Sequence, residues 1–224
     1  MEHKMKYRLA VFDMDGTILN TIEDIADSAN FFCKKYGFPE HTYEEYKYFV
    51  GNGLPKMLSR ALPEGIEGSE FQKILKEFLD YYPSHSAIKT RPYDGIVECI
   101  KELKKNNIIT AVNTNKIENA AIDLCNKYFP DCFDIISGAR DGVPPKPAPD
   151  GIFEILSKAG ITDRNTACYI GDSDVDLQTG LNSSLDFIGV DWGFRGKSFL
   201  LEHGAKTVVI NPAELKKILL FSQS

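Results

Sequence analysis

Two aspartates at the end of an apolar run have the clearest capacity for chemistry in this sequence. Asp13 and Asp15 follow residues 7–12, whose mostly apolar side chains predict a buried strand. In open α/β sheets ligands bind beyond the carboxyl ends of the strands, where an aspartate can attack phosphorus and a second carboxylate can transfer protons. Taken alone, this run is more typical of a turn in which Gly16 supplies a positive φ. The chemical interpretation therefore depends on other segments.

A hydroxyl and an amide follow a second predicted strand, residues 108–113. Thr114 and Asn115 can both hydrogen-bond phosphate oxygens at that strand end. Thr114 is equally suited to capping the helix that follows. This segment by itself leaves the two interpretations open.

A lysine in a proline-rich loop supplies a positive charge. Lys146 lies in the run Pro-Pro-Lys-Pro-Ala-Pro just before a predicted helix. The prolines stiffen the loop, and the ammonium would add to the positive end of the helix dipole. Most lysines are ordinary surface residues, but this rigid setting favours an anion site.

An acidic loop follows a further predicted strand, residues 166–170. We expect Asp172 and Asp176 to point inward, whereas Asp174 could equally cap the helix that begins there. Clustered carboxylates are ligands that suit Mg²⁺, and the longer EF-hand pattern is absent. Gathering these groups with Asp13 and Asp15 would raise some of their pKa values by repulsion, so a divalent cation and Lys146 are needed to balance the charge.

The predicted elements form an all-helical block followed by a strand and helix alternation. Residues 21–82 carry helical patterns, whereas short apolar strands alternate with helices from residue 93 onward. This alternation predicts an α/β fold with a Rossmann-like parallel sheet covered on both faces. The predicted strands are 108–113, 133–137, 166–170, 186–190 and 205–210, and the predicted helices are 95–106, 117–128, 150–159, 175–181 and 212–220.

The helical block has the position of an inserted domain. We expect an α/β core domain of residues 1–19 and 88–224 and a helical cap domain of residues 20–87, joined by linkers that would let the cap move as a lid. A chain of 224 residues suits one main domain with a modest insertion.

Composition excludes several classes of protein. The net charge of −6 argues against a nucleic-acid partner. No apolar run is long enough to span a membrane, and the polar N-terminal segment lacks the features of a secretory signal, so we expect a cytoplasmic protein. Five cysteines without a paired spacing indicate neither a disulfide framework nor a zinc site, and the four scattered histidines indicate no metal site.

Together, the motifs resemble those of the haloacid dehalogenase superfamily of phosphatases, in the same order along the chain. The matching positions begin with Asp13-Met-Asp-Gly-Thr17 and continue through Thr114 and Lys146 to the acidic loop 171–176. Residues 50–54, 146–149 and 191–194 are similar to the phosphoglycolate phosphatase branch. Asn20 departs from the aspartate common in that branch.

The resemblance implies a role for each matching residue. Asp13 would attack phosphorus, while Asp15 would protonate the leaving alcohol and then deprotonate the water that hydrolyses the aspartyl phosphate. Thr114 and Lys146 would bind oxygens of the transferring group. The implied phosphate contacts are Gly16, Thr114, Asn115 and Lys146, and the implied magnesium ligands are Asp13, the Asp15 backbone carbonyl and Asp172, with Asp176 in support.

Other members of the superfamily are alternatives. Sugar-phosphate mutases carry a cap histidine at the position of Ile25, which makes a mutase less favoured. Phosphonoacetaldehyde hydrolases use a cap lysine, and Lys56 lies in a comparable stretch, although a surface lysine is the better interpretation. A pyrophosphatase of the same superfamily is a further alternative. Lys56 and Arg60 could also contact a substrate carboxylate, against the stronger alternative of ordinary helix-surface charges.

Two further classes of protein would use the same groups differently. A phospho-receiver signalling module also gathers aspartates, a threonine and a lysine around magnesium, but it has no cap. A catalytically idle binding protein is disfavoured by the complete set of groups. We therefore predict a magnesium-dependent phosphatase, monomeric or homodimeric, acting on a small phosphorylated metabolite such as 2-phosphoglycolate.

Overall fold

The structure is a computed structural model that describes residues 6–221. Most of the polar N-terminal segment, residues 1–5, lies outside the described residues, as do residues 222–224. The chain forms two compact units, residues 1–19 with 92–224 and residues 20–91. We term these the α/β unit and the helical unit.

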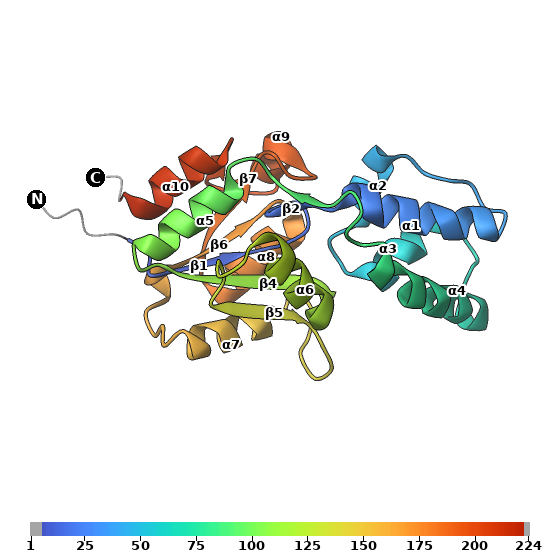
Figure 1. Ribbon diagram of the computed structural model, residues 1–224, viewed down its shortest axis with the longest axis horizontal. Helices are drawn as coiled ribbons and strands as arrows, with labels where there is room; N and C mark the ends of the chain where they lie inside the picture. The colour runs from blue at the N-terminus through green and yellow to red at the C-terminus, as the bar shows by residue number, and fades with distance from the viewer. Residues whose placement is uncertain (1–5, 222–224) are drawn as a thin grey trace, which may run out of the picture. The chain divides into compact units, whose positions relative to one another are not determined.

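The α/β unit alternates strands and helices along the chain (Figure 1). Its strands are β1 (Leu9–Phe12), β4 (Ile109–Ile117), β5 (Ile135–Ala139), β6 (Ala167–Gly171), β7 (Asp186–Val190) and β8 (Val208–Val209). Its helices are α5 (Ile96–Lys105), α6 (Glu118–Tyr128), α7 (Asp150–Lys158), α8 (Asp174–Ser183), α9 (Gly196–Glu202) and α10 (Pro212–Leu220), with a 3₁₀ turn η2 (Arg164–Thr166).

Within residues 6–221, these strands form one parallel sheet in the order β5-β4-β1-β6-β7-β8. The prediction of an α/β fold with a parallel sheet is confirmed. Because β1 lies between β4 and β6, the carboxyl ends of these three strands are neighbours. The chain continues to one side of β1 through β4 and β5 and to the other through β6, and such a switch point is where open sheets bind ligands.

Alternation along β1 distributes its side chains over two faces of the sheet. Leu9 and Val11 are fully buried in a cluster with Ile152 and Ile155 of α7. Phe12, one residue along, instead meets Phe133 edge to face, at 6.1 Å between ring centroids. A strand buried on both faces has a continuous apolar sequence, which explains the run before Asp13.

The C-terminal part of the sheet differs from the sequence prediction. β8 spans two residues where 205–210 was predicted, and α9 was not predicted at all. Helix α9 begins at Gly196, whose φ is +74°, and it buries Leu200 against Leu177 and Ala205. A helix of seven residues is too short to show a clear helical period in the sequence.

The helical unit consists of four helices and one 3₁₀ turn: α1 (Ile22–Lys35), α2 (Tyr43–Phe49), α3 (Leu54–Ala61), α4 (Gly68–Tyr81) and η1 (Tyr82–Ser84). Aromatic rings of α1 and α4 form part of its core, where Phe32 meets Phe78 at 5.9 Å between centroids. The chain passes between the units through β2 (Leu19–Asn20) and β3 (Arg91–Pro92), which pair with each other. No helix within residues 6–221 is long and apolar enough to cross a membrane.

Candidate active site

Three neighbouring strand ends of the α/β unit carry the candidate site. Asp13 directly follows β1, and its backbone N–H donates to the carbonyl of Ile170 on β6, at 2.8 Å. Asp172 directly follows β6, and Thr114 lies near the carboxyl end of β4. These three side chains are all at least 90% buried.

A buried ammonium links the first and the last motif. The Nζ of Lys146 lies 2.7 Å from Oδ1 of Asp13 and 2.7 Å from Oδ1 of Asp176. It also donates to the hydroxyl of Tyr169, at 3.1 Å, and that hydroxyl donates to the carbonyl of Asn113, at 3.1 Å. Each partner restricts where the ammonium can lie, so its charge is fixed beside Asp13.

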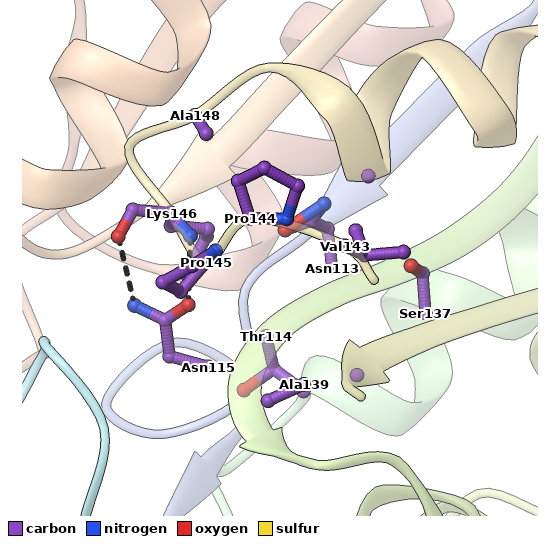
Figure 2. Close-up of a pocket in the computed structure, with 12 residues that line it drawn as sticks. Asn113, Thr114, Asn115, Ser137, Ala139, Val143, Pro144, Pro145, Lys146 and Ala148 are labelled. Carbon is purple, nitrogen blue, oxygen red and sulfur yellow. Dashed lines mark hydrogen bonds between the residues drawn. The ribbon is translucent and has the colours of Figure 1, made fainter. Parts of the chain in front are cut away.

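The loop that carries Lys146 is fixed by Asn115. The backbone N–H of Lys146 donates to Oδ1 of Asn115, at 2.8 Å, and the amide of Asn115 donates back to the Lys146 carbonyl, at 3.2 Å. Figure 2 shows the side chain of Asn115 pointing at Lys146 and hydrogen-bonded to it. Asn115, Lys146 and Thr114 are among the residues that line a small cavity of about 10 Å³. Asn115 was predicted to bind phosphate, and in the structure its side chain holds the lysine loop.

Asp172 lies in a close-fitting polar cradle. Its Oδ1 accepts from the hydroxyl of Thr17, at 3.0 Å, and its Oδ2 accepts from the backbone N–H of Phe194, at 2.8 Å. A Cβ at Gly16, where φ is +90°, would lie 2.4 Å from Oδ2 of Asp172, and a Cβ at Gly193 would lie 2.2 Å from its Cβ. Only glycine at these two positions lets the backbone approach Asp172 so closely.

Burial and mutual repulsion change the proton affinities of these groups. Burial, followed by the charge of Asp176, raises the pKa of Asp172 to about 7. The same two causes raise the pKa of Asp13 well above its ordinary value, although Lys146 opposes them. Burial alone would lower the pKa of Lys146, but the charges of Asp13 and Asp176 outweigh it and raise that pKa. Lys146 is therefore charged at neutral pH.

The donor set fits a divalent cation. Asp13, Asp172 and Asp176 offer carboxylate oxygens that all lie within 4.8 Å of one another. Ionised, they carry three negative charges against the single positive charge of Lys146, so a charge of +2 would complete the balance. Hard oxygen donors suit Mg²⁺ or a similar ion.

Comparison with known proteins places this arrangement in a family. The haloacid dehalogenase-like hydrolase family matches residues 10–190. The chain belongs to this family. The family prediction and the prediction of an enzyme are thereby confirmed.

Individual members of the family match over most of the chain. A phosphoglycolate phosphatase of Mesorhizobium japonicum is 30% identical over 194 residues, which cover 85% of each chain. An N-acetylmuramic acid 6-phosphate phosphatase of Pseudomonas aeruginosa is 28% identical over 96% of each chain. The crystal structure of a candidate phosphoglycolate phosphatase from Lactobacillus delbrueckii subsp. bulgaricus is 35% identical, with a TM-score of 0.91, and covers 96% of this chain and 99% of that one.

Two helix-capping alternatives from the sequence are wrong. Thr114 lies inside β4 and its hydroxyl accepts from the backbone N–H of Lys116, at 3.2 Å, so it does not cap α6. Asp174 is the first residue of α8, with a half-exposed side chain, and Ser173 is the cap instead. Asp176 completes that capping box, and its Oδ2 accepts from the hydroxyl of Ser173, at 2.6 Å. Asp176 therefore holds both this loop and the ammonium of Lys146 in place.

The structure adds contacts that the sequence analysis missed. Lys116 is buried, and its Nζ lies 3.2 Å from Oδ1 of Asp15. The sequence indicates Lys116 only by its position directly after Thr114 and Asn115 at a predicted strand end. Position in the sequence does not show whether a side chain is buried. Trp192 donates from its indole to the carbonyl of Thr17, at 3.0 Å. The segment 191–194 thus supports the first motif, whereas the sequence analysis used it only for the branch resemblance.

The candidate cap residues belong to the helical unit. The guanidinium of Arg60 donates to the carbonyl of Phe49, at 2.7 Å, and to Oδ1 of Asn52, at 2.9 Å. Lys56 is exposed in the first turn of α3. Their contact with a substrate remains a prediction.

Proposed function

We propose that this chain is a magnesium-dependent phosphatase that hydrolyses a small phosphate monoester through an aspartyl-phosphate intermediate, with 2-phosphoglycolate as the leading substrate. The observation that carries the proposal is the contact of the Lys146 ammonium with Asp13, beside Asp172 at the neighbouring strand end. Relatives named phosphoglycolate phosphatase support the choice of substrate.

Asp13 is the nucleophile in this proposal. One of its carboxylate oxygens forms a bond to phosphorus as the bond from phosphorus to the leaving oxygen breaks. Asp15, two residues further along, gives its proton to that leaving oxygen, so the alcohol departs neutral. Lys146 stabilises negative charge on the phosphoryl oxygens during the transfer, and Thr114 donates its hydroxyl to them.

The second half of the reaction restores Asp13. Asp15, now a carboxylate, takes a proton from water, whose oxygen attacks the phosphorus of the aspartyl phosphate. The bond from phosphorus to the Asp13 oxygen then breaks and releases inorganic phosphate. Asp13, the Asp15 backbone carbonyl and Asp172 would hold magnesium, with Asp176 in support, and the ion would neutralise charge on the transferring group.

The proposal includes the domain roles predicted from the sequence. The helical unit would act as the cap over a site built in the α/β unit, and the chain would act in the cytoplasm on a small metabolite as a monomer or homodimer. The free state of all five cysteines, each of them buried within the described residues, agrees with a reducing compartment.

A phosphate-release assay tests this function. We expect magnesium-dependent release of phosphate from 2-phosphoglycolate and none after Asp13→Asn. The panel should include N-acetylmuramic acid 6-phosphate, pyrophosphate and phosphonoacetaldehyde, which separate the alternatives within the family. Turnover by Asp13→Asn at the parent rate would remove the proposed nucleophile, and a stable phospho-protein without release would favour a receiver.

A further inference from the structure

The loop that follows β7, residues 191–194, contacts both the first motif and Asp172. The indole of Trp192 donates to the carbonyl of Thr17, at 3.0 Å. The backbone N–H of Phe194 donates to Oδ2 of Asp172, at 2.8 Å. The loop therefore lies directly against a residue that would hold the cation, although no side chain of the loop takes part in the proposed reaction.

Thr17 connects the indole with this metal ligand. Thr17 is fully buried, and Asp172 is only 1% exposed. The carbonyl oxygen of Thr17 accepts from Trp192, while its hydroxyl donates to Oδ1 of Asp172, at 3.0 Å. Because the carbonyl and the hydroxyl belong to the same residue, the indole contact restricts the position from which the hydroxyl reaches Asp172.

Hydrogen bonds of this kind orient the carboxylate of Asp172. The ammonium of Lys146 contacts Asp13 and Asp176. The two oxygens of Asp172 instead accept from the Thr17 hydroxyl and from a backbone N–H of the loop. Hydrogen bonds to a metal-ligating side chain hold its oxygens in the geometry that the ion needs, and losing one of them weakens binding of the ion. The donors around Asp172 should therefore raise the affinity of the site for a cation.

We propose that Trp192 is a positioning residue for the cation site: it holds Thr17, and through the Thr17 hydroxyl it holds the carboxylate of Asp172 in the orientation that binds magnesium. The inference rests on the magnesium site of the proposed function and names a residue that acts on that site without touching the ion. The loop has little freedom to release the contact, because it packs so closely that a Cβ at Gly193 would lie 2.6 Å from the carbonyl oxygen of Gly16.

Binding of magnesium alone, measured by isothermal titration calorimetry, tests the inference without a substrate. Thr17→Val removes the hydroxyl that reaches Asp172 and should raise Kd by roughly 10- to 100-fold. Trp192→Phe removes the indole N–H, one contact further from the ion, and should raise Kd by roughly 3- to 10-fold. The double variant should bind no more weakly than Thr17→Val, because both changes act through one hydroxyl.

Control variants show whether these losses are specific. Thr17→Ser keeps the hydroxyl and should retain most of the affinity. Tyr7→Phe removes another buried aromatic donor, whose hydroxyl lies 2.9 Å from Oδ2 of Asp186 at the start of β7, and should leave Kd unchanged. At saturating magnesium the kcat of Trp192→Phe should return close to the parent value, which a variant with a damaged fold would not do. Circular dichroism confirms that each variant is folded.

The indole itself gives a second measurement on the unaltered protein. The chain contains one tryptophan, so its emission reports on this contact. Titration with magnesium should change the emission along a saturable curve with the Kd found by calorimetry. Unchanged emission over that range would overturn the link between Trp192 and the cation site, and this titration decides the matter if Trp192→Phe does not fold.

The outcomes separate this inference from the proposed function. An unchanged Kd in Trp192→Phe, or additive losses in the double variant, would overturn the role of Trp192 and leave the phosphatase intact. Magnesium binding that depends on Trp192, without release of phosphate from any ester, would overturn the phosphatase and leave the inference standing. No binding of magnesium by the unaltered protein would overturn both.

Discussion

Within the described residues, the α/β unit contains buried ion pairs as well as exposed ones, whereas the ion pairs of the helical unit are at least partly exposed. In the α/β unit, Asp13, Asp172 and Lys146 are buried at the strand ends. In the helical unit, the ion pair of Lys76 and Asp80 lies at the surface, with side-chain exposures of 77% and 67%. Surface pairs contribute little to stability, whereas each buried charge costs several kcal/mol of desolvation. The buried charges at the strand ends therefore cost stability, which indicates that they are kept for function and not for folding.

One carboxylate of the helical unit departs from this contrast. Asp24 is buried, and it accepts from the backbone N–H groups of Ile88, Lys89 and Thr90 at 2.8–3.0 Å. These three donors hold the segment 88–90 against α1. A buried carboxylate satisfied by backbone donors alone is structural, whereas Asp13 and Asp176 of the α/β unit contact the ammonium of Lys146.

The largest expected effect is that of replacing the proposed nucleophile, compared with replacing an exposed aspartate that has no role in the reaction. Asp13→Asn keeps the shape of the side chain but removes its nucleophilic oxygen, so kcat should fall by roughly 10⁴-fold. Asp27→Asn, in an exposed ion pair of the helical unit, is the matched control and should leave kcat unchanged. Both values come from phosphate release at saturating substrate. Similar losses in the two variants would remove the contrast between the units.

Replacing Lys146 tests how much its ammonium stabilises the folded protein by pairing with the buried carboxylates of Asp13 and Asp176. Lys146→Met leaves Asp13 and Asp176 buried without their cation, which should lower the free energy of unfolding by about 3–5 kcal/mol in the absence of divalent ions. The control Lys76→Met breaks only a surface pair and should cost less than about 0.5 kcal/mol. Urea unfolding measures both. Equal losses would mean that burial makes no difference to these charges.

Asp24 should contribute to the stability of the folded protein and have no role in the reaction. Asp24→Ala leaves three backbone donors without their acceptor and should lower the free energy of unfolding by about 2–3 kcal/mol. Asp27→Ala, on the exposed side of the same helix, should cost less than about 1 kcal/mol. Thermal unfolding followed by circular dichroism makes the comparison, and an unchanged midpoint for Asp24→Ala would contradict the structural role.

The raised pKa of Asp172 predicts how stability depends on pH. Its ordinary value is 3.8, and burial with the charge of Asp176 raises it to about 7. The folded protein therefore keeps a proton that the unfolded chain loses, so this stabilisation is complete at low pH and disappears as the pH rises towards 7. Without metal the unfolding midpoint should fall between about pH 4 and 7 and then level off, by about 2–4 °C for each kcal/mol.

Magnesium should counteract that fall, because a bound cation favours the ionised carboxylates. Calorimetry with a chelator and with excess magnesium makes the comparison. Asp172→Asn removes one titrating group and should flatten the metal-free profile. A midpoint that rises with pH in the chelator would contradict the proton affinity assigned to this cluster.

The smallest expected effects lie in the helical unit. Arg60 is exposed and already donates to Phe49 and Asn52, and Lys56 is an exposed helix residue. Arg60→Ala and Lys56→Ala should each change KM for 2-phosphoglycolate by less than about twofold and stability by less than about 1 kcal/mol. A tenfold rise in KM would show that the helical unit supplies substrate contacts after all.

The sequence by itself determined the class of fold and the ends of the strands that carry chemistry. Apolar runs and helical periods are local patterns, so the alternation after residue 93 and the placement of Asp13 and Asp172 could be predicted from them. A parallel sheet brings carboxyl ends to one edge. This rule is why four segments far apart in the sequence were expected to meet.

Only the tertiary structure decided how each side chain is used. Asn115 holds the backbone of Lys146, Phe194 donates to Asp172, and Lys116 is buried beside Asp15. Local spacing carries no information on these contacts, because the burial and direction of a side chain depend on residues that are neighbours only after folding. For the same reason, α9 and the capping role of Ser173 became clear from packing and hydrogen bonds.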